Sequence, residues 1–83
     1  MNEAQEKKLR EQLEGLHEFP DLYLFKFIIP SSNKTMAEVL AHFSDKAQVT
    51  HRSSSNGKYT SISIKEVMMS ADAVIDRYRE LNG

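Results

Sequence analysis

The stretch that decides the fold runs from residue 47 to residue 67 and reads AQVTHRSSSNGKYTSISIKEV. Its two ends alternate polar residues with branched or aromatic ones, which predicts β-strands over 47–53 and 59–67. The Asn56-Gly57 pair between them is typical of a two-residue type I′ hairpin turn, because both central residues of that turn need a positive φ.

The turn also predicts the pairing of the two strands. With Ser55 opposite Lys58, Val49 lies opposite Ile64, and His51 lies opposite Ile62 on the same face. We expect His51 to be half-buried there. The other face is lined by Arg52, Tyr59, Ser61 and Ser63.

A third strand is predicted over 23–29, after Pro20 has ended the preceding segment. Both of its faces are apolar apart from Lys26, which favours a central strand or one that is covered on both sides.

Periodicity predicts three helices. Residues 2–16 form a mostly solvated helix with i,i+4 charge pairs such as Glu6/Arg10 and Arg10/Glu14, and with Gly15 as its stop. A helix of about three turns follows the 30–33 turn, and another begins after the N-cap Ser70. Their apolar stripes are Leu9, Leu13 and Leu16; Met36, Val39, Leu40 and Phe43; and Val74, Ile75, Tyr78 and Leu81.

The order helix, then β-α-β-β-α, predicts an α+β fold of the ferredoxin-like two-layer type. Residues 1–17 are a helical extension and residues 18–83 are the ferredoxin-like, ACT-like domain. The sequence stops at Gly83, where a fourth strand would begin. We therefore expect either that the natural chain continues or that a neighbouring chain covers the edge of strand 23–29.

Composition narrows the function classes. The chain has 83 residues, no cysteine and a net charge of −1, which predicts one small domain without a disulfide and argues against a dedicated nucleic-acid binder. We expect no cofactor and no metal, because the three histidines are scattered. No apolar run is long enough to cross a membrane and no signal peptide is visible, so the expected location is the cytoplasm.

The most suggestive segment for binding is the hairpin tip. Its cations, hydroxyls and turn amides could hold a phosphate or a carboxylate, and the competing interpretation is a solvated turn. With Lys26 on a sheet face, the candidate ligand or partner surface is Arg52, Ser54, Ser55, Gly57, Lys58, Tyr59 and Lys26.

Two other functions share this topology. A small acylphosphatase-like hydrolase would need a glycine-rich anion loop after the first strand, and Pro30-Ser31-Ser32-Asn33 does not resemble one. A single-stranded RNA-binding domain would need aromatic residues on its central strands, where Tyr59 is present but Ser61 is not aromatic. Neither supplies a catalytic residue to name.

Two motifs resemble the YbeD-like family, a bacterial domain family of unknown function. They are Glu18-Phe19-Pro20 followed by Tyr23, Phe25 and Lys26, and Ser54-Ser55-x-Gly57-x-Tyr59-x-Ser61-Ile62-Ser63-Ile64. The similarity extends from about Glu18 to Leu81. It implies a ferredoxin-like fold similar to ACT-type regulatory domains, which often sense small ligands and pair through their sheets. We therefore expect a non-enzymatic regulatory or interaction module that forms a homodimer, with a protein or a small anionic ligand as its partner.

Overall fold

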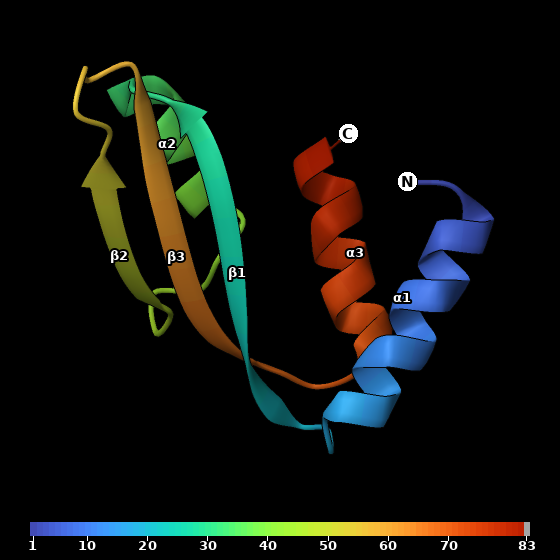
Figure 1. Ribbon diagram of the computed structural model, residues 1–83. Coiled ribbons are helices and arrows are strands. Elements are labelled where there is room, and N and C mark those ends of the chain that lie inside the picture. The colour runs from blue at the N-terminus through green and yellow to red at the C-terminus, as the bar shows by residue number, and fades with distance from the viewer. Residues whose placement is uncertain (83) are drawn as a thin grey trace. The chain divides into compact units, whose positions relative to one another are not determined.

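The computed structural model describes residues 1–82, which form three helices and a three-stranded antiparallel sheet (Figure 1). The elements follow in the order α1 (Glu3–Leu16), β1 (Asp21–Pro30), α2 (Asn33–Leu40), β2 (Gln48–Ser53), β3 (Tyr59–Met68) and α3 (Ala71–Asn82). The predicted α+β class and element order are confirmed. Two compact units make up the chain, one from Met1–Leu22 with Val67–Gly83 and the other from Tyr23–Glu66. The division into domains at residue 17 stays a prediction.

The sheet has the strand order β1-β3-β2, the order that a ferredoxin-like unit gives to its first three strands. The prediction that β1 is central, or covered on both sides, is wrong for residues 1–82. Among those residues β1 has a strand neighbour on one side only, which is β3. Phe25 is fully buried on one face, whereas Leu24 and Ile28 on the other face are 39% and 75% exposed.

The β2–β3 hairpin has the predicted register, with Val49 opposite Ile64 and His51 opposite Ile62. The predicted type I′ turn is wrong, because Asn56 does not have a positive φ and only Gly57 does, at 73°. The Gly57 amide donates to the Ser54 carbonyl at 3.0 Å, which puts Ser55 and Asn56 at the centre of the turn.

Side-chain hydrogen bonds explain why this turn differs from the predicted type I′ turn. Asn56 Oδ1 accepts hydrogen bonds from the Lys58 amide and from the Ser54 hydroxyl, at 3.0 and 2.8 Å. The Ser54 hydroxyl oxygen in turn accepts the Tyr59 amide at 3.1 Å. Because Asn and Ser side chains can replace backbone partners in a turn, the loop closes without a left-handed Asn56.

The core of the 23–66 unit lies on the face of the sheet that carries Phe25. Ile62 and Ile64 of β3 are fully buried there, and the ring centroid of Phe43 lies 5.1 Å from that of Phe25 in an edge-to-face contact. Phe43 belongs to the chain just after α2, so this segment holds the helix end on the sheet. Contrary to expectation, His51 is exposed rather than half-buried.

Helix α2 starts at the predicted N-cap region, where the Ser32 hydroxyl accepts the Thr35 amide. It is shorter than the three turns that the sequence predicts, since it ends at Leu40. The His42 and Phe43 amides donate to carbonyls only three residues back, at 3.1 Å each. Such bonds tighten a helix end and stop it from continuing as an α-helix.

In the other unit, α1 packs against α3. Leu13 is 4% exposed, whereas Leu16, expected in the same stripe, lies on the surface. Asn2 and Gln5 form a reciprocal capping box at the start of α1, and the helix runs past Gly15, its predicted stop, to Leu16.

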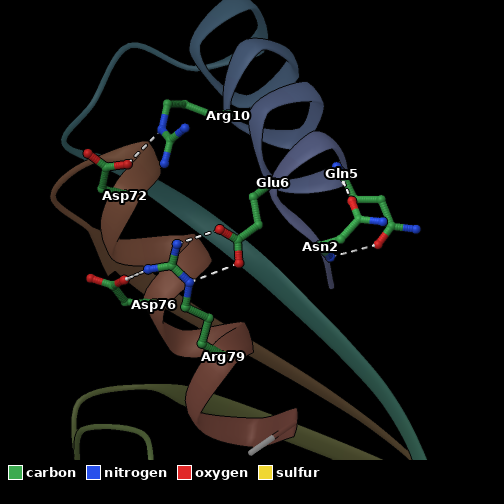
Figure 2. Close-up of polar contacts among 7 residues, drawn as sticks. All are labelled: Asn2, Gln5, Glu6, Arg10, Asp72, Asp76 and Arg79. Atoms are coloured by element: carbon green, nitrogen blue, oxygen red, sulfur yellow. Dashed lines mark hydrogen bonds and ion pairs between the residues drawn. The ribbon is translucent and has the colours of Figure 1, made fainter.

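Charged side chains join the two helices, as Figure 2 shows. Arg10 donates to Asp72 at 2.7 Å, and Arg79 donates from Nε and Nη2 to the two carboxylate oxygens of Glu6. Arg79 also pairs with Asp76 at 2.8 Å within α3. Arg10 and Glu6, which the sequence spacing predicts to pair with each other, thus take their hydrogen-bonding partners from α3.

The link from α1 to β1 contains a cis Phe19–Pro20 peptide bond. His17 Nδ1 lies 2.8 Å from Asp21 Oδ2 across this link, and the Leu22 amide donates to the other Asp21 oxygen. These hydrogen bonds lower the pKa of the Asp21 carboxyl, with the bond from His17 as the larger cause.

The two described glycines give a matched test of backbone conformation. Gly57→Ala should destabilise the fold by about 1–2 kcal/mol, because its positive φ disfavours a Cβ although nothing lies within 4 Å. Gly15→Ala should stabilise the fold by roughly 0.5–1 kcal/mol, since Gly15 is helical with open space beside it. Urea unfolding of both variants measures these changes, and equal signs for the two would contradict the analysis.

Acid should weaken the link between α1 and α3. The Arg79 guanidinium lowers the pKa of Glu6, so the pair stabilises the fold above the ordinary glutamate pKa of about 4.3 and this contribution is lost as the pH falls through the lowered value. Thermal unfolding measured at several pH values between about 7 and 3 should show this loss of stability in the unaltered protein. Glu6→Gln should remove the part of the pH dependence that comes from this pair. Glu11→Gln, an exposed change on the same helix, should keep it. Identical pH profiles for the two variants would refute the assignment.

Candidate binding surface

One face of the sheet in the 23–66 unit is open to solvent. Along β3 every second residue is buried, and the residues between them, from Tyr59 to Lys65, are exposed or half-buried. Side chains directly opposite each other on paired strands share a face, so Arg52 of β2 joins Ser61 of β3 there. We call this surface the basic face, and it consists of Leu24, Lys26, Ile28, Gln48, Thr50, Arg52, Tyr59, Ser61, Ser63 and Lys65.

The basic face has a shallow hollow of about 350 Å³ over β1 and β3. Lys26 and Ile28 line it from β1, and the small side chains of Ser61 and Ser63 line it from β3. The serines leave room between the longer side chains around them. The hollow therefore offers hydroxyl groups next to an ammonium group.

Charge on this surface has one sign. Lys26, Arg52 and Lys65 come from three different strands, and none of the residues that make up the basic face is Asp or Glu. The whole 23–66 unit has six Lys or Arg residues and three Asp or Glu residues, a formal net charge of +3. The rest of the chain has five Lys or Arg and nine Asp or Glu, a net charge of −4. The overall charge of −1 thus conceals a separation of charge between the two units.

The hairpin tip contributes fewer free donors than its sequence indicates. The Ser54 hydroxyl and the Gly57 and Lys58 amides are all used inside the turn. The Ser55 side chain and the Lys58 ammonium group remain at the exposed tip. Tyr59, which is 52% exposed, lies on the basic face, two residues before Ser61, the residue opposite Arg52.

The seven predicted site residues therefore fall into two groups. The structure brings Lys26, Arg52 and Tyr59 together on the basic face, where only the pairing of β1 with β3 could have connected Lys26 to the hairpin. The tip carries Ser54, Ser55, Gly57 and Lys58 beyond the ends of β2 and β3.

A second hollow of about 350 Å³ lies in the same unit and was not anticipated from the sequence. His51 and Ser53 face it from β2, and the Ser31 hydroxyl lies 2.8 Å from the buried Thr60 hydroxyl. The i, i+2 spacing of His51 and Ser53 places them on one face, but no sequence signal brings Ser31 beside them. In the described part of the chain, His51 makes no hydrogen bond to these hydroxyls.

A family model described as "Protein of unknown function (DUF493)" matches residues 14–83. The chain belongs to the DUF493 family. This confirms the resemblance to YbeD-like proteins that the two sequence motifs indicate. The comparison with curated proteins and the comparison with solved structures each find no match.

The residues of this DUF493 protein that match the family model include the whole basic face and exclude most of α1. Within residues 1–82, no three His, Asp or Glu side chains lie close enough together to hold a metal ion. The described helices include none that is long and apolar enough to cross a membrane.

Proposed function

We propose that this DUF493 protein is a non-enzymatic regulatory or interaction module that binds an anionic ligand on its basic face. The observation that carries the proposal is the gathering of Lys26, Arg52 and Lys65 from three strands on a face without a carboxylate. Exposed cations that lack nearby acidic residues raise the local potential and attract anions.

Each group on the face has a chemical role in this proposal. The Arg52 guanidinium presents several N–H donors in a plane and suits a carboxylate or phosphate, and Lys26 and Lys65 act as point charges. Ser61 and Ser63 donate hydroxyl hydrogen bonds from the floor of the hollow. Tyr59 offers an exposed ring against which an organic ligand can pack.

The non-enzymatic part of the proposal is tested by an activity assay. The acylphosphatase-like alternative predicts hydrolysis of an acyl phosphate. An assay with acetyl phosphate should give no activity above the buffer rate, and turnover would contradict the proposal.

Anion binding can be tested with tripolyphosphate at low ionic strength. The NMR shifts of the backbone amides on the basic face should change when tripolyphosphate is added. Arg52→Ala/Lys65→Ala should weaken binding about tenfold, since each exposed ion pair contributes up to about 1 kcal/mol. Lys34→Ala/Lys46→Ala is the matched control, because it removes two exposed cations of the same unit away from the face. Equal loss in both double variants would show that only net charge matters, and would refute the assignment.

Self-association is a second candidate, favoured by the exposed aliphatic side chains on β1, which among residues 1–82 pairs with β3 alone. If two copies pair through β1, light scattering on the purified chain should give twice the mass of 9.5 kDa. Ile28→Lys should then give a single-chain mass, while Met69→Lys, which changes an exposed apolar residue outside the 23–66 unit, should not. A single-chain mass for the unaltered protein would exclude this candidate.

A further inference from the structure

The chemical groups of the basic face follow a fixed order along β3. This strand pairs with β1 on one side and with β2 on the other, so its residues form the middle of the sheet (Figure 1). On the open face it presents a ring, two hydroxyls and an ammonium group, which belong to Tyr59, Ser61, Ser63 and Lys65. Successive members of this row are two residues apart, which is about 6–7 Å along a strand.

Cations flank the two serines from the neighbouring strands. Arg52 of β2 lies directly opposite Ser61. Lys26 of β1 lines the hollow of about 350 Å³ together with Ser61 and Ser63. Side chains directly opposite each other on paired strands lie about 4.5–5.5 Å apart, so both long cationic side chains can reach a group seated on the hydroxyls. The serines are therefore a floor for an anion between two positive charges.

The cations of this face have no acidic partner within residues 1–82. Arg52 is the only one of the four arginines that makes no ion pair in that range, whereas the three arginines of the other unit each pair with a carboxylate. Lys26 and Lys65 make no ion pair among those residues either. An arginine that is not held by a carboxylate keeps its planar N–H donors available for a phosphate group.

We infer that the basic face binds a nucleoside diphosphate or triphosphate. The base lies against Tyr59, the phosphate nearest the sugar lies on the two serines between their flanking cations, and the next phosphate lies toward Lys65. The separation of Tyr59 from Ser61 along the strand is about the length of a ribose group. The inference deepens the proposed function and rests on it, because it names the chemical class of the anion.

The exposed ring separates this ligand from an inorganic anion. The side chain of Tyr59 is 52% exposed and makes no ring contact or ion pair with the rest of residues 1–82. A purely inorganic phosphate would leave this ring in water. Every nucleic-acid base has a flat π-face that can stack on such a ring, and an alanine substitution at a stacking ring weakens binding measurably.

The number of rings separates a nucleotide from a single-stranded nucleic acid. Proteins that bind single strands stack successive bases on several aromatic side chains. Tyr59 is the one aromatic residue of the basic face, and it lies at the end of the row that is farthest from Lys65. One ring beside a cluster of three cations fits one base with more than one phosphate.

The test titrates ADP into the full chain at low ionic strength, with pyrophosphate and adenosine as ligands that each lack one part. ADP should bind about tenfold more tightly than pyrophosphate, because the stacked base adds to the phosphate contacts. Nuclear Overhauser effects should connect the adenine protons of bound ADP with the ring protons of Tyr59. They should not connect them with Tyr23 or Tyr78, the other two tyrosines of the chain.

Two sets of variants separate the parts of the site. Tyr59→Ala should lower the affinity for ADP about tenfold and leave that for pyrophosphate unchanged, while Tyr59→Phe should keep both. Lys65→Ala should weaken ADP about threefold and leave AMP unchanged, because only the second phosphate lies toward Lys65. Lys34→Ala, which removes an exposed cation of α2 in the same unit, should change neither.

Other outcomes overturn the inference. These are equal binding of ADP and pyrophosphate, Overhauser effects to a different ring, an unchanged ADP affinity in Tyr59→Ala, or equal effects of Lys65→Ala on ADP and AMP. Tighter binding of a single-stranded oligoadenylate than of ADP would also overturn it. If tripolyphosphate binds the basic face and ADP binds no better than pyrophosphate, the inference fails and the proposed function stands. If neither tripolyphosphate nor ADP binds, both fail.

Discussion

The register of the β2–β3 hairpin is the constraint on which the candidate surface depends. Ile62 and Ile64 are fully buried, and they hold the residues between them on the opposite, solvent-exposed face. A slip of one residue would exchange the faces, placing Ser61 and Ser63 in the core and the isoleucines in water. The cost of exposing two isoleucines, about 1.5–3 kcal/mol each, is large for a chain of this size. The core therefore fixes which face of β3 is open, and the pairing of Arg52 with Ser61 places Arg52 on that face.

The sheet also gathers charge that is dispersed along the chain. Lys26 and Arg52 are 26 positions apart in the sequence, yet they share one face because β3 lies between their strands. A net charge of −1 disfavours anion binding only if charges are spread evenly, and here the 23–66 unit is basic while the remainder is acidic. The local potential at a surface follows the nearest charges, because water and salt screen the distant ones within about 10 Å.

Charged residues on α1 illustrate how tertiary partners displace local ones. The sequence places Glu6 and Arg10 at i,i+4 spacing, an arrangement worth only about 0.2–0.5 kcal/mol on an exposed helix. Arg79 offers Glu6 a two-point contact through its planar guanidinium, and Asp72 lies within 2.7 Å of Arg10. A side chain takes the partner that fits its geometry best, and helix spacing alone does not reveal which partners α3 brings near. The same limit explains the turn, where Asn56 and Ser54 bond to one another and to the backbone.

The sequence by itself determined the α+β class, the order of the six elements, the hairpin register and the family. These properties follow from period-two and period-3.6 patterns and from local residue chemistry, which act over a few neighbouring positions. It also named Arg52, Tyr59 and Lys26 as candidates, though without a common surface. Only the tertiary structure decided that β1 pairs with β3 and has one open face, that Lys26 joins Arg52 there, and that the Ser54 hydroxyl is used within the turn. These features depend on which distant segments pack together. The residue pattern within one segment does not specify which segments those are.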